Sequence, residues 1–340
     1  MNSQTIPDQL SAIVDLQDNL YGGDYDSFVG WSATHPFFEQ VEGMKLLAYE
    51  ISILSCIRHM DSEKIASVCE RILNYPKFTG VFKEELFNHL MSRSPHIAYR
   101  LLLSGKFSTM EIEKFLDSAR NYPFLFYFAP ELSKFETYAK KFSSNPTFSR
   151  IYSKIDFYRE NNWSKLKEIR EMSWDMDSLG YALKFDKVNL LEAMYEQNNV
   201  DENLEIEWSS FEMFLKPRTT KPLGVAASYG SVRCFEYLVE KSFKIDNHIG
   251  SCAFSGGQSL IIEKCLEKYQ NDESLIASSI RYSVRFFWNK IFDSYYDKLP
   301  SEGKYSWAEK SDNEEFLNIR LCLFVFEGGY TINSNFGRVI

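Results

Sequence analysis

Apolar residues recur at helical spacing along the first half of the chain. Between Gly43 and Met60 they fall at i, i+3 and i+4 steps, which is typical of a helix that turns one apolar stripe towards a core. The same spacing resumes between Ile65 and Ile72 after a short break. The pattern predicts a series of amphipathic helices joined by short turns.

Local signals place the ends of two of these helices. Ser108 and Glu111 have the spacing of a capping box, in which each side chain bonds the other residue's backbone N–H, before an apolar run. Pro95 suits the first turn of a helix, because backbone N–H groups there have no acceptor within the helix and proline, which has no N–H, loses no hydrogen bond. Gly105 suits the end of that helix. We therefore expect helices that start at residues 95 and 109.

In the second half, helical stretches come in pairs that share a repeat frame. A small residue marks the centre of each first helix: Ala182, Ala226, Ala253 and Ser279. A turn residue follows four positions later: Asp186, Gly230, Gly257 and Ser283. Apolar residues follow at eight, nine and twelve positions: Leu190, Leu191 and Met194; Cys234, Phe235 and Leu238; Ile261, Ile262 and Cys265; Phe287, Trp288 and Ile291. The frame predicts four antiparallel helix pairs.

Each position of the repeat frame has a physical role. A small residue lets adjacent first helices approach closely, and a Gly or Asp at the turn tolerates positive φ. The apolar residues bury the second helix against its neighbours. We therefore expect an all-α fold, a helical solenoid of antiparallel helix pairs.

The segment Pro222–Glu240, with its turn at Tyr229-Gly230-Ser231, resembles one unit of an ankyrin repeat. The C-terminal run of pairs therefore resembles a series of degenerate ankyrin-like repeats, and residues 321–333 resemble a weaker last copy. The intervals between small residues, from 182 to 226, 253 and 279, are 44, 27 and 26 residues, and the longest holds an insertion at residues 198–219. The family's Thr-Pro-Leu-His opening is eroded here to Thr220-Lys-Pro-Leu-Gly224.

Together with the helical segments at residues 82–103 and 124–128, these short units resemble divergent ankyrin-repeat proteins found in some protists, which have an N-terminal helical region of unknown function. The resemblance implies binding of a partner protein on the concave face of the array, and no catalysis. Carried over to this sequence, the partner-binding residues are the exposed positions of the first helices: Lys184, Phe185, Ser228, Tyr229, Ser255, Arg281 and Tyr282.

The pattern divides the chain into an N-terminal helical region at residues 1–170, ankyrin-like repeats at 171–300 and a degenerate terminal repeat with a tail at 301–340. The weakest seams lie at residues 143–146 and 171–177.

Composition restricts the partners. With 44% hydrophobic and 25% charged residues a packed core is feasible, and a net charge of -9 gives no reason to bind nucleic acid. The apolar stretch Leu46–Ile57 contains Glu50 and is shorter than the ~20 residues of a membrane helix. The scattered cysteines form no CxxC pair, which favours reduced, buried thiols in the cytoplasm, with the nucleus as the open alternative.

Motifs for chemistry are incomplete. The segment around Ser228 half-matches a nucleophile elbow but lies in a helical pattern, and residues 175–186 begin like a calcium loop but have Leu179 at a ligand position. The five histidines show no ligand spacing. We therefore predict no catalytic residue, cofactor, metal or small-molecule substrate.

Three functional hypotheses follow. The first is a non-enzymatic scaffold that binds a partner protein of unknown identity. The alternative is a structural component of a larger assembly, such as a cytoskeletal lattice, because exposed aromatic residues need a partner surface. The third is an enzyme whose site is assembled across helices.

Overall fold

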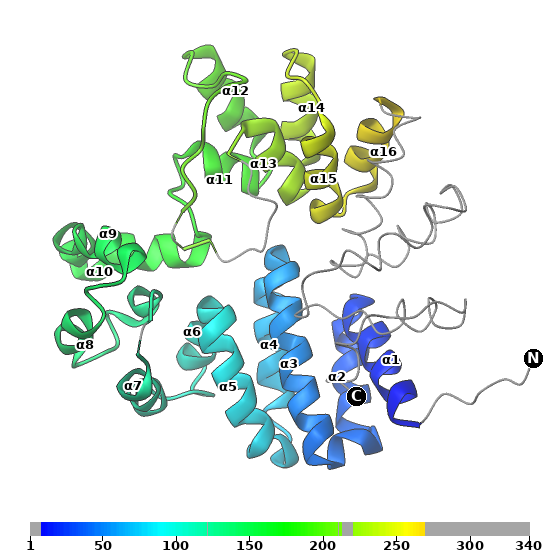
Figure 1. Cartoon of the computed structure of the whole chain (residues 1–340), viewed down its shortest axis with the longest axis vertical. Coiled ribbons are helices and arrows are strands. Elements are labelled where there is room, and N and C mark those ends of the chain that lie inside the picture. Colours follow the sequence, from blue (N-terminus) through cyan, green and yellow to red (C-terminus); the bar gives the residue numbers. More distant parts are fainter. Residues whose placement is uncertain (1–7, 121, 210, 213–219, 269–340) are drawn as a thin grey trace, which may run out of the picture. The chain divides into compact units, whose positions relative to one another are not determined.

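The structure, a computed structural model, describes residues 8–120, 122–209, 211–212 and 220–268. These residues form sixteen α-helices and four short 3-10 helices, and no strand occurs among them. The predicted all-α character is therefore confirmed for this part of the chain (Figure 1).

The chain divides into two compact units. Of the described residues, the first unit comprises 22–120, 122–175, 209 and 211–212, and the second comprises 8–21, 176–208 and 220–268. The long range of the first unit ends at Asp175. Helix α10 (Ile155–Met172) ends three residues before this point.

The first unit contains most of the helices. They are α2 (Tyr25–Thr34), α3 (Val41–Ile57), α4 (Ser62–Ile72), α5 (Val81–Arg93), α6 (Pro95–Leu103), α7 (Thr109–Ser118), α8 (Phe135–Lys141), α9 (Pro146–Tyr152) and α10, with the 3-10 helices η1 (Pro36–Glu39), η2 (His59–Asp61), η3 (Pro76–Phe78) and η4 (Leu125–Phe128). Helices two apart in the sequence pack together, α2 on α4, α4 on α6, and α3 on α5 (Figure 1).

The predicted helix ends in this unit are confirmed. The Ser108 backbone N–H donates to Glu111 Oε2 at 2.8 Å, and the Glu111 N–H donates back to Ser108 Oγ at 3.2 Å. Such a cap stabilises a helix by about 1 kcal/mol. Pro95 starts α6, and Gly105 follows that helix with φ +73°.

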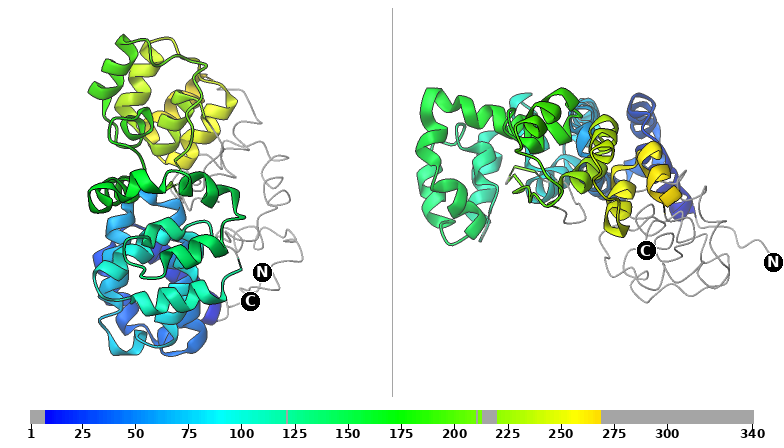
Figure 2. Two further views of the ribbon diagram at one scale, coloured as in Figure 1. Left: turned by 90° about the vertical axis from the view of Figure 1, so that its left-hand side faces the viewer. Right: turned by 90° about the horizontal axis from the view of Figure 1, so that it is seen from above.

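In its described part, the second unit holds α1 (Asp8–Tyr21) and three consecutive helix pairs. The pairs are α11 (Leu179–Lys184) with α12 (Val188–Glu196), α13 (Pro222–Tyr229) with α14 (Val232–Glu240), and α15 (Asn247–Gly256) with α16 (Ser259–Lys268). First helices pack on one another in the order α11, α13, α15, and second helices in the order α12, α14, α16 (Figure 1; Figure 2 gives two further views). Ser279, the fourth pair, the last copy at 321–333 and the predicted tail lie outside the described residues.

The repeat frame matches the structure in its small and turn positions. Ala182, Ala226 and Ala253 sit on the three first helices and are fully buried. The predicted positive φ is confirmed at each described turn: Asp186 (52°), Gly230 (70°) and Gly257 (69°). At the first two turns the next backbone N–H donates to the carbonyl of the small residue, at 2.9 and 3.0 Å, which satisfies the helix end.

The apolar positions of the frame are mostly core residues. Those of α14 and α16 are buried: Cys234, Phe235, Leu238, Ile261, Ile262 and Cys265. In α12, Leu191 is buried but Leu190 and Met194 are only half-buried. The five cysteines of the described residues are buried thiols, as predicted, and Cys322 lies outside these residues.

Candidate partner-binding surface

The residues predicted to line an exposed groove are largely buried. Lys184, Ser228, Tyr229 and Ser255 are at most 7% exposed. Phe185 is half-buried. The other two positions of that prediction, 281 and 282, lie outside the described residues. The expectation of exposure is therefore wrong at four of the five described positions.

Aromatic packing explains much of this burial. The Lys184 Nζ atom lies 5.6 Å from the ring centroid of Phe185 and 5.8 Å from that of Tyr229. The ring of Trp208, which comes from the insertion, lies 6.1 Å from that of Tyr229. The insertion was located from the sequence, but its packing role was not foreseen.

Helix α13 carried a signal that was missed. All eight of its residues are buried, and its sequence from Pro222 to Tyr229 has no charged residue on any face. A helix that is apolar all round is normally buried on every side. Comparison with typical ankyrin units suggested an exposed face here, and the composition of the helix argued against one.

The first junction, between the α11–α12 pair and the α13–α14 pair, is polar. Asp186 Oδ1 accepts a hydrogen bond from the Cys234 backbone N–H at 2.8 Å, and its Oδ2 accepts from Arg233 Nε at 3.2 Å. The Ser231 hydroxyl donates to the Leu183 carbonyl. The turn residue of one pair therefore caps the second helix of the next pair. Burial, together with the nearby Asp186 carboxylate, raises the pKa of the Cys234 thiol, which stays protonated.

The second junction, between the α13–α14 pair and the α15–α16 pair, is built on glycine. A Cβ atom added to Gly256 would lie 2.1 Å from the Ala227 carbonyl oxygen. A Cβ atom on Gly230 would lie 2.5 Å from Gln258 Cγ and 3.0 Å from the Gly256 carbonyl oxygen. Helices α13 and α15 therefore approach so closely at this end that Gly256 has no room for a side chain.

Outside the core, the second helices present two rows of glutamates. Counted from the small residue of each pair, position ten is Glu192, Glu236 and Glu263, and position fourteen is Glu196, Glu240 and Glu267. All six side chains are exposed or half-buried. We call this surface of α12, α14 and α16 the glutamate face.

The glutamate face costs stability. On each helix the two glutamates stand at i and i+4, where like charges destabilise a helix by roughly 0.2–0.5 kcal/mol. Those at position fourteen lie in the last turn, where the helix dipole disfavours negative charge. An ion pair between Lys264 Nζ and Glu236 Oε1, at 2.6 Å, offsets part of this loss of stability. The arrangement is thus not one that stability alone would favour.

The candidate motifs for chemistry have structural roles in the described residues. Ser228 is buried within α13 and not at a strand-to-helix turn, so it does not form a nucleophile elbow. In the calcium-like segment, Ser178 Oγ accepts the Tyr181 N–H at 3.1 Å and starts α11, and Asp175 pairs with Lys165. The described part of the chain has no group of three or more His, Cys, Asp or Glu side chains placed to hold a metal ion.

Among the described helices, none combines the length and apolar character that crossing a membrane requires. Comparison with models of known protein families, with curated proteins and with solved structures finds no match to this chain.

Proposed function

We propose that residues 179–268 are three units of a degenerate ankyrin-like solenoid, and that the chain is a non-enzymatic scaffold. In this proposal the glutamate face binds a basic surface of a partner protein. The observation that carries it is the glutamate face itself, which repeats two carboxylates on three consecutive helix pairs, exposed on all three at position fourteen and exposed or half-buried at position ten.

The packing order supports the solenoid. First helices contact first helices and second helices contact second helices, and every described turn residue has the same left-handed backbone. An array of this kind displays one residue of each unit at equivalent places along its surface, so a repeated side chain becomes a row.

Electrostatics supports the choice of face. Carboxylates in rows attract a partner with complementary positive charge and disfavour acidic partners. Because these glutamates weaken their own helices, a role in binding explains their repetition better than a role in folding. The buried positions of the first helices, Lys184, Ser228, Tyr229 and Ser255, do not offer a comparable surface.

The test compares two sets of neutralising substitutions in the full chain. The first set is Glu196→Gln, Glu240→Gln and Glu267→Gln on the glutamate face. The control set removes the same charge from exposed positions of the first unit: Glu42→Gln, Glu84→Gln and Glu171→Gln. Proximity labelling in the native cell would identify partners of the wild-type protein, and recovery of each would then be measured for both variants.

We expect the variant with the first set of substitutions to recover less of the partners with basic surfaces than wild type does. The variant with the control set should recover as much as wild type. The first set should also unfold at higher urea concentration, because it removes negative charge from helix C-termini. The control set should show no net gain in stability, because Glu42 and Glu84 lie in first turns, where negative charge is favourable, and their loss offsets the gain at Glu171 in the last turn of α10. Equal recovery by both variants would remove the glutamate face from the proposal.

A further inference from the structure

An aromatic cluster in the first unit surrounds a residue from a distant part of the chain, and we call the rings around that residue the aromatic pocket. The ring of Phe211 lies 5.5 Å from that of Tyr127, and 6.4 Å from those of Phe126 and Tyr158, between centroids. Phe211 is 3% exposed. It belongs to the insertion between α12 and α13, yet it packs among residues of η4 and α10.

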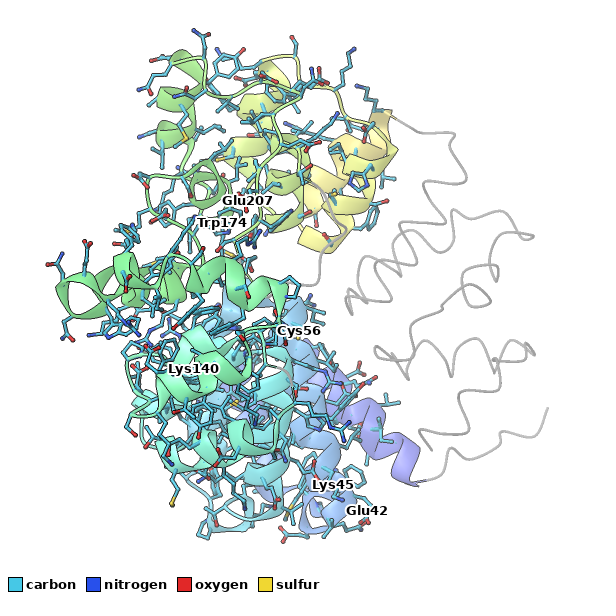
Figure 3. The ribbon with its side chains drawn as sticks, turned by 60° about the vertical axis from the view of Figure 1, so that its left-hand side comes forward. Glu42, Lys45, Cys56, Lys140, Trp174 and Glu207 are labelled. Atoms are coloured by element: carbon cyan, nitrogen blue, oxygen red, sulfur yellow. The ribbon has the colours of Figure 1, made fainter. Side chains whose placement is uncertain are left out.

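Two polar groups of the pocket bond the same short segment. The Tyr127 hydroxyl donates to the Phe211 carbonyl oxygen, and the Trp174 indole N–H donates to Glu212 Oε2 at 3.2 Å. Figure 3 labels Trp174, which follows the end of α10. The pocket thus contacts the Phe211 side chain, the Phe211 carbonyl and the carboxylate of the next residue.

Burial, and next the Glu212 carboxylate, raise the pKa of the Tyr127 hydroxyl well above its usual value. This hydroxyl therefore remains a hydrogen-bond donor at neutral pH.

The pocket wall is held by groups other than its occupant. The buried Arg170 side chain donates to the Tyr127 carbonyl at 2.8 Å and forms a two-pronged ion pair with Glu131 at 2.9 and 3.0 Å. Its guanidinium lies 3.8 Å from the ring centroid of Tyr99. These contacts fix η4 against α10 and α6, so the pocket does not depend on Phe211 alone for its shape.

The occupant belongs to a short segment that is preceded and followed along the chain by residues of the second unit. Ser209, Phe211 and Glu212 group with the first unit, whereas residues 176–208 and 220–268 group with the second. Within the segment, the backbone N–H of Phe211 donates to Ser209 Oγ at 3.2 Å, which gives it a local turn. A short motif with one aromatic anchor and one carboxylate is the kind of ligand that a partner protein can also supply.

We propose that this pocket is a peptide-binding site for an aromatic residue followed by an acidic one in a partner protein. In this proposal, Phe211 and Glu212 are an intramolecular ligand that the partner displaces. Tethering gives the chain's own segment a high effective concentration, so the site is closed until a partner competes. The site lies in the first unit and goes beyond the proposed role of the glutamate face.

The test uses the full chain with Phe211→Ala and a fluorescent peptide with the sequence of residues 206–212, Ile-Glu-Trp-Ser-Ser-Phe-Glu. We expect the variant to bind the peptide at least about 10-fold more tightly than wild type, because its own anchor is gone. A peptide with Ala in place of Phe should not bind. Adding Trp174→Phe to the variant should weaken binding, since the indole N–H that donates to the carboxylate is removed.

Several results would overturn the proposal. One is a Phe211→Ala variant that keeps its circular dichroism and cooperative unfolding but does not bind the peptide. Another is a variant that loses its fold, because the segment would then be a fixed part of the core. The milder Glu212→Gln variant gives a second measurement: it should stay folded and bind more peptide than wild type. A dimeric wild-type protein that exchanges this segment between copies would assign the pocket to self-association instead.

The glutamate face and the pocket can fail separately. Substitutions in the pocket should not change the recovery of partners with basic surfaces. The Glu→Gln substitutions on the glutamate face should not change peptide binding.

Discussion

The first junction of the second unit is polar, whereas the second junction is built on glycine. Both follow a turn residue with positive φ, Asp186 in one and Gly230 in the other. At the first junction the carboxylate uses its position to cap α14. At the second the missing side chains let α13 and α15 approach closely. One backbone geometry therefore supports two kinds of joint, one of hydrogen bonds and one of close contact.

The largest effect should come from Gly256→Ala at the second junction. The new Cβ atom would lie 2.1 Å from the Ala227 carbonyl oxygen, a backbone atom that cannot rotate away. We expect a loss of about 3 kcal/mol in the free energy of unfolding, measured by urea titration with circular dichroism.

Gly30→Ala is the matched control for that variant. Gly30 lies inside α2, and a Cβ atom there would meet nothing within 4 Å. This substitution should stabilise the protein by about 0.5–1 kcal/mol, because alanine favours helix. A Gly256→Ala variant as stable as wild type would show that the second junction is not closely packed.

Asp186→Ala at the first junction should cost about 2 kcal/mol. The substitution removes the cap of α14 and places an alanine at φ 52°, and each change is worth about 1 kcal/mol. Asp186→Gly removes the cap but relieves the backbone, so it should cost about half as much in the same urea titration. Equal losses for the two variants would mean that backbone strain contributes nothing at this turn.

Gly230→Ala should cost about 1–2 kcal/mol, from the positive φ and from contact with Gln258. Part of this contact is with the flexible Gln258 side chain. Removing it with Gln258→Ala should therefore recover a few tenths of a kcal/mol to about 1 kcal/mol in a double-mutant cycle. Strict additivity of the two substitutions would place the whole cost in the backbone.

The sequence predicted much of the fold because its signals were local. The capping box at Ser108 and the turns at Asp186, Gly230 and Gly257 depend on residues close in the chain, and the structure has them as predicted. The small residues Ala182, Ala226 and Ala253 also mark three helices that pack in series.

The sequence could not predict contacts between distant segments. The exposure expected of Tyr229 and Lys184 was wrong because Trp208, from an insertion with no helical pattern, packs against Tyr229. The pocket around Phe211 joins η4, α10 and that same insertion, and no spacing in the sequence connects them. The glutamate face could have been found, since both rows follow from the repeat frame once charged positions are counted as well as apolar ones.

The smallest effect separates the two junctions by their response to salt. The Arg233 side chain is 64% exposed and forms an ion pair with Asp186. Exposed ion pairs contribute at most about 1 kcal/mol to the free energy of unfolding. We expect Arg233→Ala to cost about 0.5 kcal/mol at low ionic strength and less in 1 M sodium chloride, because salt screens exposed charges. The cost of Gly256→Ala should not change with salt beyond the shift seen for wild type, since it arises from atomic overlap. Urea titrations of both variants at two salt concentrations provide the measurement. A salt-independent cost at Arg233 would show that its side chain acts at the first junction through packing, and the distinction between a polar and a close-packed joint would then rest on Asp186 alone.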